Sequence, residues 1–387
     1  MGKSVCLVTS EESFCTNYGA PLQGYALYRT LSSLGYETNI LRYKSGPAHT
    51  RDSLLNRVRR VVMGNDLRAI VQKVKFRANQ KLMTEDHKKR YQLFLSFQHE
   101  HMTFCNSKRL TWEELRAKPI AADIYVCGSD QIWNPLFRGN TNDRGYFLAF
   151  APEHAKLVAY APSLGVPSIS EELKKDMGEL LKRFDHISVR ESTGAAIVSE
   201  ILGYDVPNVL DPAFLLTEND WKQIAKPHQT PERYALAYLF GYEYSHISIA
   251  KEIAQKLGLP VISLPMSAIA EAEKDFVKDY GVGPLEFIHL VENAELVITD
   301  SFHAVVFSLI MQTPFVVFPR PVVGGNDMNS RITDLLDMVN LTDRIVYQRG
   351  NIDYDSLLCV EWSCVSKVLA EKRQASKEWL IAALGNG

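Results

Sequence analysis

The sequence predicts an α/β protein built from two doubly wound, parallel-sheet domains with a cleft between them. Three observations predict it: short apolar runs alternate with helical patterns, the alternation restarts after residue 216, and polar residues gather where the runs end. A chain of 387 residues is long enough for two such domains. Because ligands of these folds bind at the carboxyl ends of the strands, we expect the site to face the cleft.

The first domain, expected over 1–216, opens with a strand–helix–strand unit. An apolar run at 4–10 is followed by a helical pattern that ends at Gly35, a residue typical of helix C-termini, and by a second run at 37–43. Strands joined in this way run parallel with a right-handed crossover, so the unit predicts a parallel sheet. Further strands are expected at 122–127, 156–161, 186–190 and 208–211.

A polar stretch around 213–232 marks the boundary between the domains, and the second domain is expected over 217–360. Its predicted strands are 234–240, 260–265, 295–300, 314–319 and 343–348, separated by helices at 245–258, 284–294, 301–312 and 329–339. Residues 361–387 are expected to form a C-terminal helix that packs back on the first domain.

Residues 51–105 are expected to form a helical insertion in the first domain. Its segment 51–90 carries a net charge of +8 against −10 for the rest of the chain, and its apolar residues recur at helical spacing. This pattern predicts a basic amphipathic helical hairpin. Two interpretations remain open: an apolar stripe on the core below a solvated basic face, or a surface for anionic lipid or a lipid pyrophosphate.

Composition and charge argue against several classes of protein. A formal net charge of −2 does not favour a nucleic-acid binder. No apolar run reaches the ~18–20 residues that span a bilayer, and the six cysteines form no CxxC pair. The start MGKSVCLVTS lacks a signal-peptide pattern, so we expect a cytoplasmic protein. Neither GxGxxG nor a P-loop is present, and no pattern predicts a metal site.

His303 lies in the first turn of an apolar helix, directly after the predicted strand 295–300. The N–H groups of such a turn attract phosphate or carboxylate, and Asp300 or Ser301 can cap it. A histidine placed there can donate a proton to an anionic substrate. The alternative is a structural histidine bonded to a loop carbonyl.

Three arginines also lie at strand or helix ends: Arg190, Arg320 and Arg331. Guanidinium groups form the bidentate hydrogen bonds that phosphate and carboxylate prefer. Any one of them alone would more often be a surface ion pair, so the prediction of an anion site depends on their converging.

The first domain has three strand-end turns that are rich in small and polar residues, at 15–27, 127–135 and 160–166. Trp133 in the second turn could stack on a sugar ring. The candidate residues of the three turns are Asn17, Tyr18, Gly19, Gln23, Ser129, Asp130, Gln131, Trp133 and Ser163.

The chain resembles the polysaccharide pyruvyl transferase family in motifs that run in order from about residue 5 to 345. They are NYGAPLQGYAL, VCGSDQIWNP, YAPSLG, SVRES, VLDPAFLL, ITDSFHAVVFSLIMQTPF and SRITDLL. Ala304 and Pro162 depart from the family's usual residues, but neither change removes a chemical group. The resemblance implies two Rossmann-like domains of GT-B type and transfer of the enolpyruvyl unit of phosphoenolpyruvate to a sugar. The product is a pyruvate ketal in bacterial surface polysaccharide.

On this resemblance we expect His303 to donate the proton and the arginines to bind the donor. Asp300 would orient His303 or act as base, unless it only caps the helix. The expected catalytic residues are His303, Asp300 and Arg190. The expected donor-binding residues are Arg190, Ser301, His303, Arg320, Arg331 and Ser163. The expected acceptor-binding residues are Asn17, Tyr18, Gly19, Gln23, Ser129, Asp130, Gln131 and Trp133.

The expected partners are phosphoenolpyruvate as co-substrate and a sugar or lipid-linked oligosaccharide as acceptor, with no cofactor, metal or nucleic acid. Segment 51–90 is the candidate contact with the inner face of an anionic membrane. Two alternatives stay open: a GT-B glycosyltransferase that uses a nucleotide sugar, and a non-catalytic binding protein of the same fold.

Overall fold

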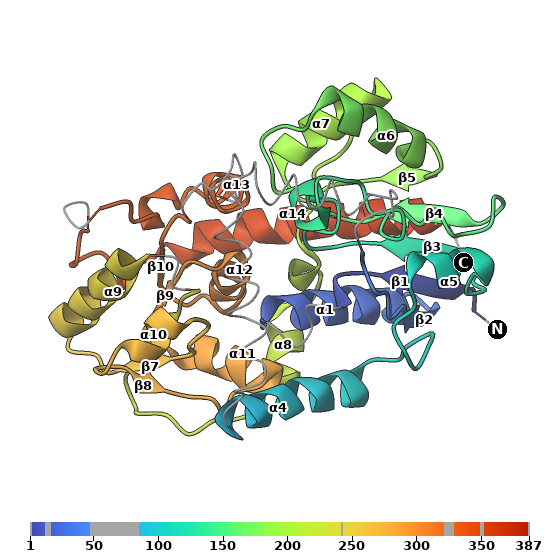
Figure 1. The fold of residues 1–387 in the computed structure, drawn as a ribbon. Helices are drawn as coiled ribbons and strands as arrows, with labels where there is room; N and C mark the ends of the chain where they lie inside the picture. The colour runs from blue at the N-terminus through green and yellow to red at the C-terminus, as the bar shows by residue number, and fades with distance from the viewer. Residues whose placement is uncertain are drawn as a thin grey trace, which may run out of the picture.

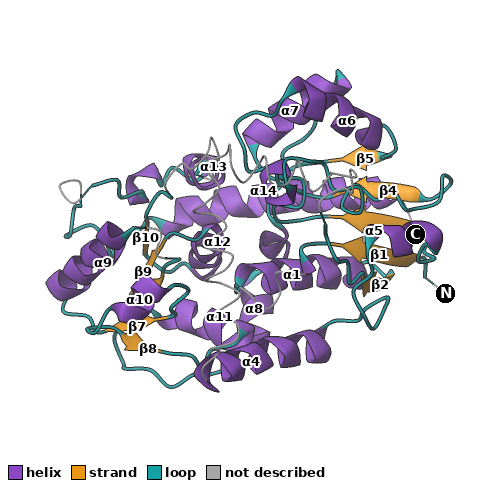
Figure 2. Cartoon of the chain, viewed as in Figure 1, coloured by secondary structure: helices purple, strands orange, loops and turns teal. Residues whose placement is uncertain are grey.

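The computed structural model describes residues 2–11, 17–46, 85–240, 243–320, 329–348 and 352–385 (Figure 1). Residues 51–84, which make up most of the predicted basic hairpin, lie outside the described residues. The chain forms two α/β units, each around one parallel sheet, as the sequence predicts (Figure 2). Among the described helices, none is both long and apolar enough to cross a lipid bilayer.

The first sheet has the strand order β2-β1-β3-β4-β5, and all its pairs are parallel. Its central strands are almost entirely buried, as expected for a sheet that is covered by helices on both faces. The strands are β1 (Ser4–Val8), β2 (Glu37–Ile40), β3 (Ile124–Cys127), β4 (Lys156–Ala159) and β5 (His186–Ile187). The predicted strand at 208–211 is reduced to a single bridge between Val189 and Asn208, because the chain turns into a 3-10 helix at Pro212.

The second sheet has the order β10-β9-β6-β7-β8, again with parallel pairs. Its strands are β6 (Ala235–Tyr238), β7 (Val261–Ser263), β8 (Val277–Lys278), β9 (Leu296–Thr299) and β10 (Phe315–Val317). The sequence missed β8, a two-residue edge strand with little apolar signal. The predicted strand at 343–348 is instead a 3-10 turn followed by one bridge from Ile345 to Val317.

Helices cover both sheets (Figure 2). In the first unit they are α1 (Gly19–Ser33), α4 (Glu85–His101), α5 (Trp112–Ala117), α6 (Glu171–Leu181) and α7 (Ser192–Leu202), with 3-10 helices η2 (Pro135–Arg138) and η3 (Pro212–Leu215). In the second they are α8 (Glu218–Ile224), α9 (Tyr244–Leu257), α10 (Ala268–Ala272), α11 (Pro284–Asn293), α12 (Phe302–Met311) and α13 (Ser330–Met338), with the 3-10 helix η4 (Thr342–Arg344). The chain continues into α14 (Trp362–Leu384).

One hydrophobic core joins the two units. It includes side chains of β1 and α1 from the first unit and of α11 and α12 from the second. Tyr18 lies at the junction, where its ring stacks on Phe287 with centroids 4.6 Å apart and its hydroxyl donates to the Val282 carbonyl at 3.1 Å. Burial of this much apolar surface fixes the position of one unit against the other.

Two helices reinforce the junction by contacting both units. Arg90 of α4 donates to the carbonyls of Pro265 and Asp279 in the second unit at 2.9 and 2.8 Å. The long helix α14 runs back across both units (Figure 1), and its Ser376 hydroxyl accepts from the Leu210 N–H at 3.0 Å. The strand ends of the two sheets are therefore held facing each other.

We expect Tyr18→Ala to lower the free energy of unfolding by about 3–5 kcal/mol, because it removes a buried ring from the shared core. Tyr18→Phe keeps the ring and loses one hydrogen bond, so its cost is about 1 kcal/mol. Urea denaturation followed by circular dichroism measures both. Equal stability of Tyr18→Ala and the wild type would show that this junction is not stabilising.

Candidate functional site

A pocket of about 280 Å³ opens where the carboxyl ends of the two sheets face each other. Both units contribute to its wall, as expected for a ligand site in doubly wound folds. The lining residues are Ser10, Asn17, Asp130, Gln131, Phe137, Arg138, Phe240, Ser301, Phe302, His303, Arg320 and Arg331. Three guanidinium groups against one carboxylate make this wall suited to an anion.

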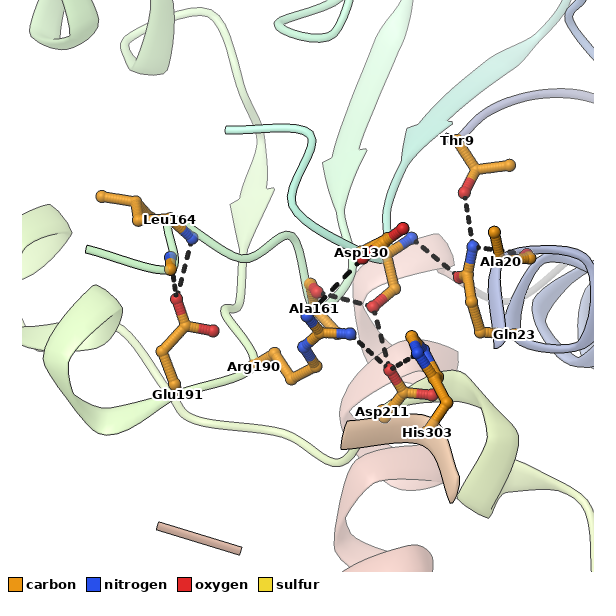
Figure 3. A network of polar contacts seen from close by, with 12 residues as sticks. Thr9, Ala20, Gln23, Asp130, Ala161, Leu164, Arg190, Glu191, Asp211 and His303 are labelled. Atoms are coloured by element: carbon orange, nitrogen blue, oxygen red, sulfur yellow. Dashed lines mark hydrogen bonds and ion pairs between the residues drawn. The ribbon is translucent and has the colours of Figure 1, made fainter. Parts of the chain in front are cut away.

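Behind the pocket, the buried carboxylate of Asp211 joins the two units (Figure 3). Arg190 Nη1 donates to Asp211 Oδ2 at 2.7 Å, and His303 Nε2 lies 3.6 Å from the same oxygen. The Ser129 hydroxyl lies 3.4 Å from Oδ2, and the Ala213 N–H donates to Oδ1 at 3.0 Å. Arg190 comes from the first unit and His303 from the second, so Asp211 fixes both side chains across the junction.

The environment of Asp211 favours its ionised form. Burial by itself raises the pKa of a carboxyl group, but the nearby His303 and Arg190 outweigh this effect and hold the pKa of Asp211 well below its ordinary value of 3.8. An ionised carboxylate at this position orients the imidazole ring, as the aspartate of a catalytic triad does.

Gly19 allows His303 to approach the first unit. A Cβ atom on Gly19 would lie 2.2 Å from both Cγ and Nδ1 of His303, far inside van der Waals contact. Any larger residue at the start of α1 would displace the ring. Gly19 is thus placed against the histidine and does not line the pocket, and its expected contact with an acceptor sugar stays a prediction.

Arg331 is a buried cation at the pocket wall. Burial, together with the neighbouring Arg190 and Arg320, lowers its pKa to about 9, although Glu191 and Asp130 act in the opposite direction. Its guanidinium approaches the ring of Phe302 at 5.5 Å, and its Nε has no hydrogen-bond partner among the described residues. A bound anion would offset the cost of burying this charge.

Arg320 is the last of the three arginines that were predicted from the sequence to form an anion site. Its Nε donates to the Asp300 carbonyl at 2.7 Å, and its guanidinium stacks 4.5 Å from the ring centroid of Phe240. These contacts fix the side chain at the pocket wall, where Ser301 and His303 also lie. A preoriented guanidinium binds an anion with less loss of conformational entropy.

The structure places three proposed site residues behind the pocket: Arg190 and Ser163 of the expected donor site, and Asp300 of the expected catalytic set. Arg190 is paired with Asp211 and does not line the pocket, so it positions other groups. Ser163 is fully buried and its N–H donates to the Asp130 carbonyl at 2.9 Å. Asp300 is also fully buried, and its Oδ1 accepts from the Phe240 N–H at 2.9 Å. The carboxylate that lies against His303 is thus Asp211, which corrects the expectation that Asp300 orients the ring.

Four proposed acceptor-site residues belong to the core. Trp133 is 1% exposed and stacks on Phe147 with centroids 4.8 Å apart, so neither face of its ring is free for a sugar. Gln23 is fully buried and donates to Thr9 and Ala20 (Figure 3). Tyr18 and Ser129 are buried as well. Of the acceptor set, Asn17, Asp130 and Gln131 line the pocket.

Sequence reasoning also missed residues that the structure brings to the site. Asp211 is part of the motif VLDPAFLL and ends the predicted strand at 208–211, and that position was its available signal. Phe137 and Arg138 follow the motif VCGSDQIWNP by a few residues and carry no signal of their own. Arg138 adds a guanidinium from the first unit, held 4.8 Å from the ring centroid of Tyr146.

Comparison with known proteins identifies the family. A sequence profile described as polysaccharide pyruvyl transferase matches residues 17–320, most of the chain and nearly all of the pocket wall. The chain belongs to this family. A comparison with curated proteins gives no significant sequence match.

Solved structures resemble the chain in fold. The S. aureus MnaA-UDP co-structure superposes with a TM-score of 0.50 at 9% identity, covering 95% of this chain and 91% of that chain. The UDP-GlcNAc 2-epimerase of Methanocaldococcus jannaschii, in complex with UDP-GlcNAc and UDP, gives 0.46 at 13% identity, with 100% of both chains covered. The E. coli ADP-heptose lps heptosyltransferase II gives 0.38 at 11% identity, covering 96% and 99%. At such identities the likeness concerns the fold alone.

We expect Gly19→Ala to reduce anion binding and turnover while the protein stays folded, because the new methyl group displaces His303. Titration with phosphoenolpyruvate followed by calorimetry measures the change. Gly46→Ala is the matched control, since a Cβ there meets no atom within 4 Å. Wild-type binding and turnover by Gly19→Ala would contradict the role given to this contact.

The depressed pKa of Asp211 predicts how stability depends on pH. A group that releases its proton more easily when folded stabilises the protein above its unfolded pKa. This contribution should therefore be lost as the pH falls below about 4, towards the lower pKa of the folded state. The difference in unfolding free energy between the wild type and Asp211→Asn should shrink over that window. A constant difference between pH 3 and 7 would contradict the assignment.

Proposed function

We propose that this protein transfers the enolpyruvyl group of phosphoenolpyruvate to two hydroxyl groups of a sugar and forms a pyruvate ketal. The observation that carries the proposal is a small pocket in which three guanidinium groups and one histidine converge. Phosphoenolpyruvate bears a phosphate and a carboxylate, which are the groups that arginines bind best. Membership of the polysaccharide pyruvyl transferase family supports the same reaction.

The size of the pocket favours a small donor. Its volume of about 280 Å³, as bounded by the described residues, lies at the lower end of ligand pockets. Phosphoenolpyruvate together with part of one sugar suits this space better than a nucleotide sugar does. In the proposal, Arg320 and Arg331 bind the two anionic groups of the donor, and Arg138 completes the positive wall from the first unit.

His303 would donate a proton to the methylene carbon of the donor. The methylene carbon then becomes a methyl group and the carbon–carbon double bond is lost. Positive charge develops at C2, next to the oxygen that carries the phosphate. A sugar hydroxyl attacks C2 and releases its proton. Asp211 holds the imidazole in place throughout, and the arginines stabilise the charge of the departing phosphate.

The second half of the reaction would close the ring. The bond from C2 to the phosphate oxygen breaks, phosphate leaves with the electron pair, and the second hydroxyl attacks C2. Two hydroxyl protons are released in total, of which one balances the proton taken up by the methylene carbon and one ends on phosphate or solvent. The residues of this chain thus bind the donor, orient the imidazole of His303 and transfer a proton.

We expect phosphoenolpyruvate to raise the melting temperature, since a ligand that binds only the folded state at about 100 times its Kd adds about 2.7 kcal/mol. Arg331→Lys should abolish most of the shift, because lysine cannot donate in bidentate fashion. Arg233→Ala should keep it, since that arginine pairs with Glu295 on the surface. A shift with UDP-glucose and none with phosphoenolpyruvate would favour a glycosyltransferase instead.

We expect His303→Gln to bind phosphoenolpyruvate but to turn over about 10²–10⁴-fold more slowly, because it cannot supply the proton. Phosphate release in the presence of methyl β-D-galactopyranoside or the methyl glycoside of N-acetylmannosamine measures turnover. Formation of the ketal can be verified by the appearance of its methyl resonance in the proton NMR spectrum. Near-normal turnover of the variant would rule out His303 as the residue that donates the proton.

A further inference from the structure

Phe137 lines the pocket, and its aromatic ring belongs to none of the hydrophobic clusters formed by the described residues. Half of its surface, 50%, is exposed, although it is a phenylalanine. It lines the same pocket as His303 and Arg331, from the first unit. Exposed aromatic rings inside a pocket are typical of ligand contacts, because solvated apolar surface there gains free energy only when something covers it.

The segment around Phe137 is firmly anchored. Trp133 is buried just before it, and the side chain of Asn134 accepts from the Leu136 N–H at 3.0 Å, which starts the 3-10 helix η2. Gly139 ends η2 in the left-handed region at φ 69°, and Arg138 is held against Tyr146. With both neighbouring positions fixed, the Phe137 ring projects as a rigid surface and would lose little entropy on binding.

Polar residues of the first unit line the same pocket as this ring. They are Asn17, Asp130 and Gln131. A pyranose ring carries C–H groups on its faces and hydroxyl groups at its edge. A pocket wall that offers both an aromatic ring and polar groups therefore suits the two kinds of surface that a sugar presents.

We propose that Phe137 is the platform on which the acceptor hexopyranose stacks, in the role that Trp133 cannot fill from the core. The inference rests on the proposed function and deepens it, since it names the class of acceptor and the residue that selects it. With one face of the sugar covered by Phe137, the hydroxyl groups at its edge face the half of the pocket formed by His303, Arg320 and Arg331. A hexopyranoside with free hydroxyls at C4 and C6 can then form a six-membered ketal ring.

The test compares Phe137→Ala with Phe137→Trp and the control Leu136→Ala. Leu136 is the neighbouring residue and is 40% exposed, but it does not line the pocket. With methyl β-D-galactopyranoside and the methyl glycoside of N-acetylmannosamine as acceptors, we expect Phe137→Ala to raise the acceptor KM about tenfold or more. The KM for phosphoenolpyruvate should stay within about twofold, and Phe137→Trp and Leu136→Ala should resemble the wild type.

A binding measurement separates this inference from the proposed reaction. Saturation-transfer NMR detects either methyl glycoside on the protein in the presence of phosphoenolpyruvate, whether or not turnover follows. We expect the signal in the wild type and its loss in Phe137→Ala. Retained signal in that variant, no signal in the wild type, or an equal rise in both KM values overturns the platform. Failure of phosphoenolpyruvate to bind at all overturns the proposed function instead.

Discussion

The arrangement of the site depends on one buried carboxylate, Asp211. A carboxylate without solvent must be compensated by positive or hydrogen-bonding groups, and here these are Arg190 from one unit and His303 from the other. These two contacts with Asp211 therefore fix the histidine at the pocket wall and hold Arg190 outside the pocket. The geometry of the candidate site and the junction of the two units are stabilised by the same interaction.

The shared hydrophobic core explains how such a contact can be maintained. An ion pair across two separately moving units would break whenever they opened, leaving charges buried without partners. Tyr18, packed between the rings of the second unit, prevents this by joining the cores. The short distance between Gly19 and His303 follows from the same packing. The pocket wall is thus preorganised, with Arg320 fixed by the Asp300 carbonyl and the ring of Phe240, and Arg138 held against the ring of Tyr146.

The sequence predicted the fold well because buried parallel strands read as continuous apolar runs. LVIT at β9 is such a run, and the position of His303 just after it follows from chain order alone. Side-chain direction in loops could not be predicted in the same way. Trp133 and Phe137 lie four residues apart, and Trp133 enters the core, where it stacks on Phe147, a partner distant from the motif. Asp211 and Asp300 likewise both end predicted strands, and only the packing of the two units selects the one that reaches His303.

The role proposed for this pocket can be tested by a crystal structure of the protein soaked with phosphoenolpyruvate. We expect the donor between Arg320 and Arg331, with its anionic groups within hydrogen-bond distance of both guanidinium groups and its methylene carbon facing His303. A donor bound elsewhere, or an empty pocket at a saturating concentration, would show that this pocket does not bind phosphoenolpyruvate.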